Sequence, residues 1–102
     1  MQRPIRTTRI EMPEPYEGWS ATIQTNITMG VYDRLVGSDW EQKLGALVET
    51  VREWNFVDDA GEPVELVVTT VKNALGFDQI KLLIAEIDQE IGRFLRELST
   101  SD

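Results

Sequence analysis

Six large apolar residues near the end of the chain recur at intervals of 4, 3, 4, 3 and 4 positions. They are Ile80, Ile84, Ile87, Ile91, Phe94 and Leu98. This heptad spacing places all six on one face of an α-helix, which we expect from Gln79 to Leu98 with Asp78 as its cap. Because such a stripe must be covered to be stable, the chain has to supply a second layer of structure or recruit one.

Leu82 adds an apolar group on nearly the opposite side of this predicted helix, since successive residues are rotated by about 100°. A helix with apolar groups on two sides has to be covered on both sides. A small two-layer domain has little material for the second side, so we expect self-association or a partner protein there. The alternative is that the stripe packs only on a central helix of the same chain.

Two alternating segments predict an N-terminal β-hairpin. Residues Thr7–Met12 alternate weakly, and in Gly18–Ile27 apolar and β-branched residues occupy every second position. Pro13 and Pro15 interrupt regular structure between the two segments. We therefore expect two antiparallel strands, with Trp19 at the start of the second.

The next part of the chain favours helices. Residues Thr28–Leu35 predict a short helical segment, and a stronger amphipathic helix is expected from about Asp39 to Glu53. Ser38 and Glu41 match a capping box, in which the two side chains satisfy free amides at a helix start.

A dense turn signal, Asp58-Asp-Ala-Gly-Glu-Pro63, follows the extended stretch Trp54–Val57. Val64–Val68 either returns as the second strand of another short hairpin or begins a further helix. Thr69 is a candidate cap for a helix that starts after this stretch, and Gly76 is a candidate stop.

Together these segments predict an α+β fold. We expect a mostly helical single domain over residues 1–102, with an N-terminal β-hairpin, a central amphipathic helix and a long C-terminal helix. Residues 1–6 and 99–102 are expected to fray.

The composition removes most catalytic chemistry. The 102 residues include no cysteine and no histidine, so the chain has no thiolate nucleophile, no imidazole base and no common zinc ligand. It also has no glycine-rich phosphate loop and no serine nucleophile motif. We therefore expect a non-enzymatic protein that holds neither a metal nor another cofactor.

Two groups of carboxylates are candidates for acid–base or metal chemistry. Asp58, Asp59 and Glu62 surround Gly61 in the predicted turn, where aspartate is favoured because its side chain bonds nearby backbone. The other acids lie within residues 86–90 on the last predicted helix. Di-metal helical sites pair such acids with histidine, which is absent. A structural turn and a solvated helix face are the favoured interpretations.

The net charge of −8, from 18 acidic and 10 basic residues, argues against binding to nucleic acid, because a negative surface repels phosphate backbones. Arg3, Arg6 and Arg9 are interpreted as solubilising charges at a frayed or edge strand, in preference to a phosphate-binding arm. No apolar run approaches the ~20 residues of a membrane span, and no export signal is recognisable. We expect no membrane partner and a cytoplasmic location.

Large aromatic rings are the remaining functional candidates. Trp40 and Trp54 flank the central helix and are expected in the core, whereas Trp19 could lie in the core or line an interface. The candidate protein-interface residues are Trp19, Ile80, Leu82, Ile84, Ile87, Ile91, Phe94 and Leu98.

Two stretches of the sequence resemble small tail assembly chaperones of long-tailed bacteriophages. In that family a Pro-x-Pro-Tyr-x-Gly-Trp segment leads into a strand, and an amphipathic helix precedes a Trp-Asn-Phe-x-Asp-x-x-Gly-x-Pro turn. The corresponding residues are Pro13, Pro15, Tyr16, Gly18, Trp19, Trp54, Asn55, Phe56, Asp58, Gly61 and Pro63. The family's short polar stretch after the turn is replaced here by a more apolar one, Glu65–Thr69.

The resemblance implies a role in assembly. Such chaperones coat the long helical tape measure protein while the tail tube assembles, often self-associate, and are absent from the mature virion. A longer frameshifted form recruits tail tube subunits in many of them. We therefore expect tape measure protein and tail tube subunits as partners, homo-oligomers, and a location in the host cytoplasm.

Two other functions stay open from the sequence. One is a structural tail or connector component that is retained in the virion. The other is a small acidic regulatory or inhibitor protein that mimics nucleic acid, which requires carboxylates clustered on one exposed face.

Overall fold

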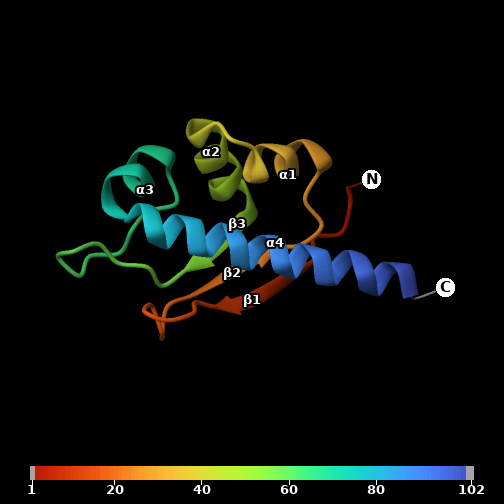
Figure 1. The fold of residues 1–102 in the computed structure, drawn as a ribbon, viewed down its shortest axis with the longest axis horizontal. Coiled ribbons are helices and arrows are strands. Elements are labelled where there is room, and N and C mark those ends of the chain that lie inside the picture. Colours follow the sequence, from red (N-terminus) through yellow and green to blue (C-terminus); the bar gives the residue numbers. More distant parts are fainter. Residues whose placement is uncertain (1, 101–102) are drawn as a thin grey trace.

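The computed structural model describes residues 2–100 (Figure 1). Within these residues the chain forms a three-stranded antiparallel sheet and four α-helices. In chain order the elements are β1 Thr7–Glu11, β2 Ser20–Gln24, α1 Met29–Val36, α2 Trp40–Thr50, β3 Val51–Trp54, α3 Val68–Ala74 and α4 Phe77–Thr100. The predicted fold class is confirmed: an α+β domain, mostly helical, with an N-terminal hairpin and a long C-terminal helix.

The sheet has one covered face and one open face. In Figure 1, α4 runs across the sheet, and α1, α2 and α3 lie together along one side of α4. Ile10, Ala21 and Ile23 point into the core and are buried, whereas Arg9 and Glu11 are exposed. This alternation along the strands is expected of an antiparallel sheet that packs on helices with one face only.

The predicted N-terminal hairpin is confirmed. β1 pairs antiparallel with β2 in a continuous register from Thr7 opposite Gln24 to Glu11 opposite Ser20. The connection contains a cis peptide bond before Pro15, and Gly18 takes a positive φ of 90°, a backbone conformation that favours glycine.

The helix that follows the hairpin is also confirmed, but the cap of the central helix differs from its prediction. The Asp39 carboxylate accepts hydrogen bonds from the amides of Glu41 and Gln42, at 3.0 and 3.2 Å. Asp39 therefore takes the capping role predicted for Ser38. Both residue types are good N-caps, and the sequence pattern alone does not choose between adjacent ones.

The predicted end of the central helix at Glu53 is wrong. α2 ends at Thr50, and Val51–Trp54 form β3 on the free edge of β2. β2 offers backbone hydrogen bonds to these residues, and this long-range pairing ends the helix although the apolar spacing continues through Val51.

Residues 64–67 form neither of the two predicted elements. Val57 and Pro63 make an isolated antiparallel bridge, so the turn between them closes without a second strand. α3 begins at Val68, and its N-cap is Val67, which makes no side-chain capping bond. The predicted cap at Thr69 is therefore wrong.

α4 is the longest element, with 24 residues against 5 in β1 and in β2. At about 1.5 Å per residue it is about 36 Å long, roughly twice the length of a five-residue strand. It begins at Phe77, two residues before the predicted start, and the Gln79 side chain accepts a bond from the Gly76 amide at 2.7 Å. None of the helices formed by the described residues combines the length and hydropathy that a bilayer span requires.

Candidate protein interface

The apolar stripe of α4 is divided into a covered half and an uncovered half. Ile80, Ile84, Ile87 and Ile91 are buried in the core of the single chain. Farther along the helix, Phe94 is half-buried and Leu98 remains 51% exposed. Figure 1 shows the reason, because the last turns of α4 continue past the sheet.

This division narrows the predicted interface. The four isoleucines already contact the chain's own core, so they offer a partner little surface, and only Ile91 also lines the groove described below. Of the predicted stripe, only Phe94 and Leu98 remain accessible.

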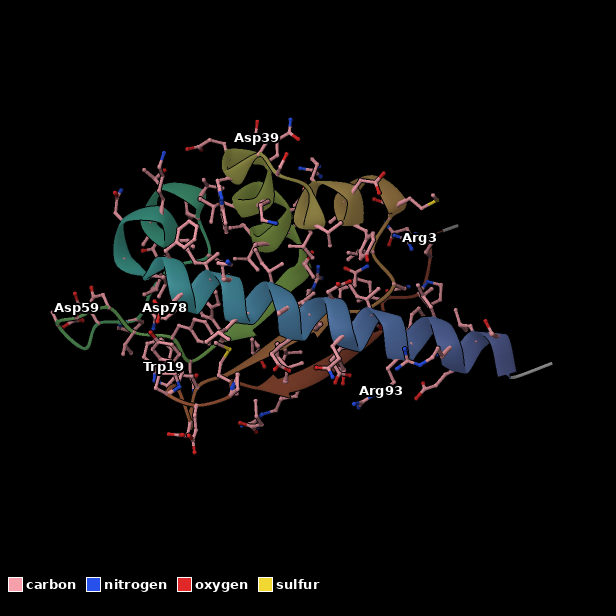
Figure 2. The ribbon with its side chains drawn as sticks, in the orientation of Figure 1. Arg3, Trp19, Asp39, Asp59, Asp78 and Arg93 are labelled. Carbon is pink, nitrogen blue, oxygen red and sulfur yellow. The ribbon has the colours of Figure 1, made fainter. Side chains whose placement is uncertain are left out.

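Leu82 does not form the uncovered second side that its position predicts. It is half-buried and packs against the core cluster, as do Tyr16 and Trp19. The Tyr16 hydroxyl donates to the carboxylate of Asp78, which precedes Leu82 by one helical turn on the same side of α4. The β1–β2 connection is therefore held at the same end of α4 as Leu82, and Figure 2 shows Trp19 and Asp78 there.

Trp19 belongs to an aromatic row that joins the two stretches resembling tail assembly chaperones. Its ring lies 5.7 Å from that of Tyr16 and 5.0 Å from that of Phe56, and Phe56 stacks on Trp54 at 4.4 Å. Asn55 adds hydrogen bonds between the stretches: its side chain accepts from the Ser20 amide and donates to a carbonyl of the β1–β2 connection. These residues have a structural role.

An apolar groove lies beside the uncovered half of α4. Its volume is about 360 Å³, and we call it the α1–α4 groove. It is lined by Arg3, Thr25, Asn26, Ile27, Thr28, Met29, Tyr32, Asp33, Ile91, Phe94 and Leu95. Two of these side chains are among the most exposed large apolar groups of the described residues, Met29 at 82% and Leu95 at 55%. The groove thus combines an open hollow with uncovered apolar groups.

Sequence reasoning did not assign Met29 or Leu95 to an interface. Both belong to helices, α1 and α4, whose apolar residues are normally expected to point to the core. The signal that could have found them is the mismatch between a long helix and a sheet of short strands, which leaves part of an apolar pattern without cover.

A second exposed apolar site, formed by aromatic rings, lies at the start of α4. The Phe77 ring is 60% exposed and lies 4.5 Å from the ring of Trp40. The ammonium group of Lys43 lies 5.1 Å from the centre of the Trp40 ring, and that of Lys81 lies 6.0 Å from the centre of the Phe77 ring. Trp40 is half-buried against the core, in line with its prediction, whereas Phe77 was not singled out from the sequence.

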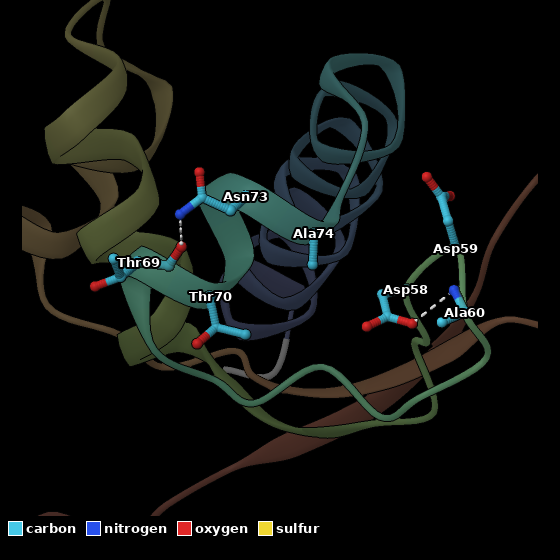
Figure 3. A pocket seen from close by; sticks show the side chains of 7 residues that line it. All are labelled: Asp58, Asp59, Ala60, Thr69, Thr70, Asn73 and Ala74. Atoms are coloured by element: carbon cyan, nitrogen blue, oxygen red, sulfur yellow. Dashed lines mark hydrogen bonds between the residues drawn. The ribbon is translucent and has the colours of Figure 1, made fainter.

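The acidic turn faces α3 across a shallow hollow of about 480 Å³ (Figure 3). The Asp58 carboxylate accepts from the amides of Ala60 and Glu62, at 2.9 and 3.0 Å. Asp58 is therefore used to hold the turn, as the sequence indicated. In Figure 3 the side chain of Asp59 points away from the carboxylate of Asp58. Among the described residues, no three metal-ligating side chains come together here or elsewhere.

Two tyrosine hydroxyls donate hydrogen bonds to carboxylates of α4, and these bonds shift the pKa values of groups that take part in them. The hydrogen bond from Tyr16 raises the pKa of that tyrosine and lowers the pKa of Asp78. Tyr32 of α1 donates to Asp88 at 2.7 Å, and this bond, with lesser effects of burial and nearby negative charge, raises the pKa of Tyr32. Both bonds fix the position of α4 relative to the rest of the chain.

No family model, no curated protein and no solved structure matches this chain.

Proposed function

We propose that this chain is a non-enzymatic, protein-binding assembly protein, and specifically a tail assembly chaperone that holds the helical tape measure protein of a long-tailed bacteriophage. The observation that carries the proposal is the α1–α4 groove beside the uncovered half of α4. An amphipathic helix fits such a site by laying its apolar face in the groove, where Met29 and Leu95 are exposed.

The charge of the chain agrees with a holding role. A net charge of −8 keeps a protein soluble while it exposes apolar side chains. The resemblance to tail assembly chaperones supplies the identity of the client. The aromatic residues among those that carry it form the row around Trp19 and Phe56. In the proposed function these residues hold the fold, and the groove contacts the client.

Nucleic-acid mimicry has less support from the charges. It requires free carboxylates on one face, but several acids are paired: Glu49 with Arg34, Glu90 with Arg93, and Asp88 with the Tyr32 hydroxyl. We therefore favour a protein client.

Binding of the full chain to a synthetic amphipathic segment of a tape measure protein tests the groove. We expect Leu95→Glu to weaken the binding, measured by calorimetry, by at least about tenfold, because it places a charge against the client's apolar face. Val67→Glu is the matched control, since Val67 is similarly exposed but lies next to α3, away from the groove. Equal binding by wild type and a folded Leu95→Glu variant would remove the groove from the proposal.

Mass spectrometry of purified virions tests the chaperone role against the structural one. A chaperone is shed during assembly, so we expect the chain to be absent from mature particles. Its presence there in stoichiometric amounts would favour a retained tail or connector component.

A further inference from the structure

The outer edge of β1 carries backbone groups without partners. β1 is an edge strand, because the sheet order is β1-β2-β3. The Thr25 amide donates to the Arg6 carbonyl and the Met12 amide to the Trp19 carbonyl, both at 2.8 Å. In an antiparallel ladder every second residue turns its amide and carbonyl toward the partner strand. Residues 6, 8, 10 and 12 therefore face β2.

The backbone groups of Thr7, Arg9 and Glu11 consequently point away from the sheet. Within residues 2–100, none of the hydrogen bonds outside the sheet involves the amide or carbonyl of these three residues. Three amides and three carbonyls thus form a short template for another strand. Pro4 and Pro13, which have no amide hydrogen, lie just beyond its two ends and limit its length.

A hollow of about 550 Å³ lies next to this edge, between β1 and the uncovered half of α4. Arg6 and Thr8 line it from the sheet. Arg93, Phe94 and Leu98 line it from α4, together with the carboxylates of Glu90 and Glu97. In Figure 2 the side chain of Arg93 projects from α4 on the side of β1. Side chains on the inner face of an added strand would therefore enter this hollow.

The charges and apolar groups of the hollow define the occupant. Of the two carboxylates in the hollow, Glu90 pairs with Arg93 at 3.3 Å. None of the ion pairs among the described residues includes Arg6, so its guanidinium can take a further carboxylate. Phe94 and Leu98 offer apolar contacts beside it. Cross-strand neighbours lie about 5 Å apart, so an inward carboxylate opposite Arg6 would be within reach of its side chain.

We propose that the β1 edge binds an extended segment of another protein as a fourth strand, with branched apolar residues and one carboxylate on its inward face. In antiparallel pairing the carboxylate lies toward the carboxyl end of the segment, beside Arg6. This site is distinct from the α1–α4 groove, which lies on the other side of Phe94 and takes a helix.

Amide hydrogen exchange of the full chain, followed by NMR, tests the proposal. The probe is a seven-residue peptide with threonine at odd positions and valine, valine and glutamate at positions two, four and six. Without peptide, the amides of Thr7, Arg9 and Glu11 should exchange quickly and those of Thr8 and Ile10 slowly. Saturating peptide should slow exchange at the first three by at least tenfold and leave the other two unchanged.

Two variants test whether the outward backbone amide of β1 is needed for binding, and a second peptide tests whether the carboxylate is needed. Arg9→Pro removes the central outward amide without removing a β1–β2 bond, and should weaken peptide binding at least tenfold. Arg9→Val removes the same charge but keeps the amide, and should bind within twofold of wild type. A peptide with lysine in place of glutamate should bind at least tenfold more weakly. Should Arg9→Pro fail to fold, the exchange rates of the wild-type chain with and without peptide still test whether the β1 edge binds a strand.

Three results would overturn the proposal. One is the absence of peptide binding at millimolar concentration. Another is binding that protects residues of the α1–α4 groove and leaves the β1 edge unprotected. The last is protection of Thr7, Arg9 and Glu11 that rises with protein concentration without peptide, because the occupant would then be a second copy of the chain.

Discussion

Two alanine substitutions on α4 measure how unequally its stripe is covered. Ile87 is fully buried, whereas Leu95 is 55% exposed, and each loses three carbons on mutation to alanine. At about 0.8 kcal/mol per buried methylene, Ile87→Ala loses about 2.4 kcal/mol of burial, and the cavity raises the cost to about 3–4 kcal/mol. Leu95→Ala should cost about 1 kcal/mol or less, because about half of that surface is already in water.

Urea unfolding followed by circular dichroism measures the free-energy cost of each substitution, and thermal unfolding followed in the same way measures the change in Tm. For a domain of about 100 residues, 1 kcal/mol corresponds to a shift in Tm of about 4–8 °C, so Ile87→Ala should melt about 12–32 °C below wild type. Alanine is the best helix former, so helix propensity does not produce the difference. A cost for Leu95→Ala that equals the cost for Ile87→Ala would refute the reasoning, since it would mean that the end of α4 is covered.

Three further predictions concern single contacts. Asp39→Ala should destabilise the chain by about 1 kcal/mol in urea unfolding, and Ser38→Ala should change it little, because only Asp39 caps α2. Gly30→Ala should raise the free energy of unfolding by roughly 0.5–1 kcal/mol, because α1 has space for the added methyl group. The raised pKa of Tyr32 predicts that its bond to Asp88 stabilises the fold below pH 10.0, the ordinary tyrosine pKa, and is lost as pH rises through the raised pKa. Unfolding free energies of wild type and Tyr32→Phe should therefore converge above pH 10.0; a gap that widens would contradict this sign.

Local patterns predicted the elements whose signals lie within a few residues. The alternation in Gly18–Ile27 predicted β2, and the heptad spacing after Asp78 predicted α4 to within two residues at each end. The Asp58 turn was also recognised, because its hydrogen bonds are local. Each of these features depends on neighbours in the sequence.

The errors arose where distant residues decide. Val51 continues the apolar spacing of α2, but pairing with Ile23 on β2 makes it a strand residue. Leu82 packs on a core built from distant parts of the chain, and Tyr16 bonds Asp78 on the same helix from more than 60 residues earlier.

The candidate site was half predictable for the same reason. Spacing identified the stripe that contains Phe94 and Leu98, but it could not show which turns of the helix pass beyond the sheet. The width and position of a sheet depend on strand pairing, so the accessible part of the stripe became visible only in the folded chain.

The arrangement of the aromatic rings gives the chain built-in optical reporters. Trp19 and Trp54 lie together around Phe56, whereas Trp40 contacts Phe77 at the start of α4. Indole emission therefore originates from two separate neighbourhoods, and Trp40→Phe would leave only the first. Comparing the emission of this variant with that of wild type during unfolding would show whether the hairpin side and the helical side of the molecule melt together.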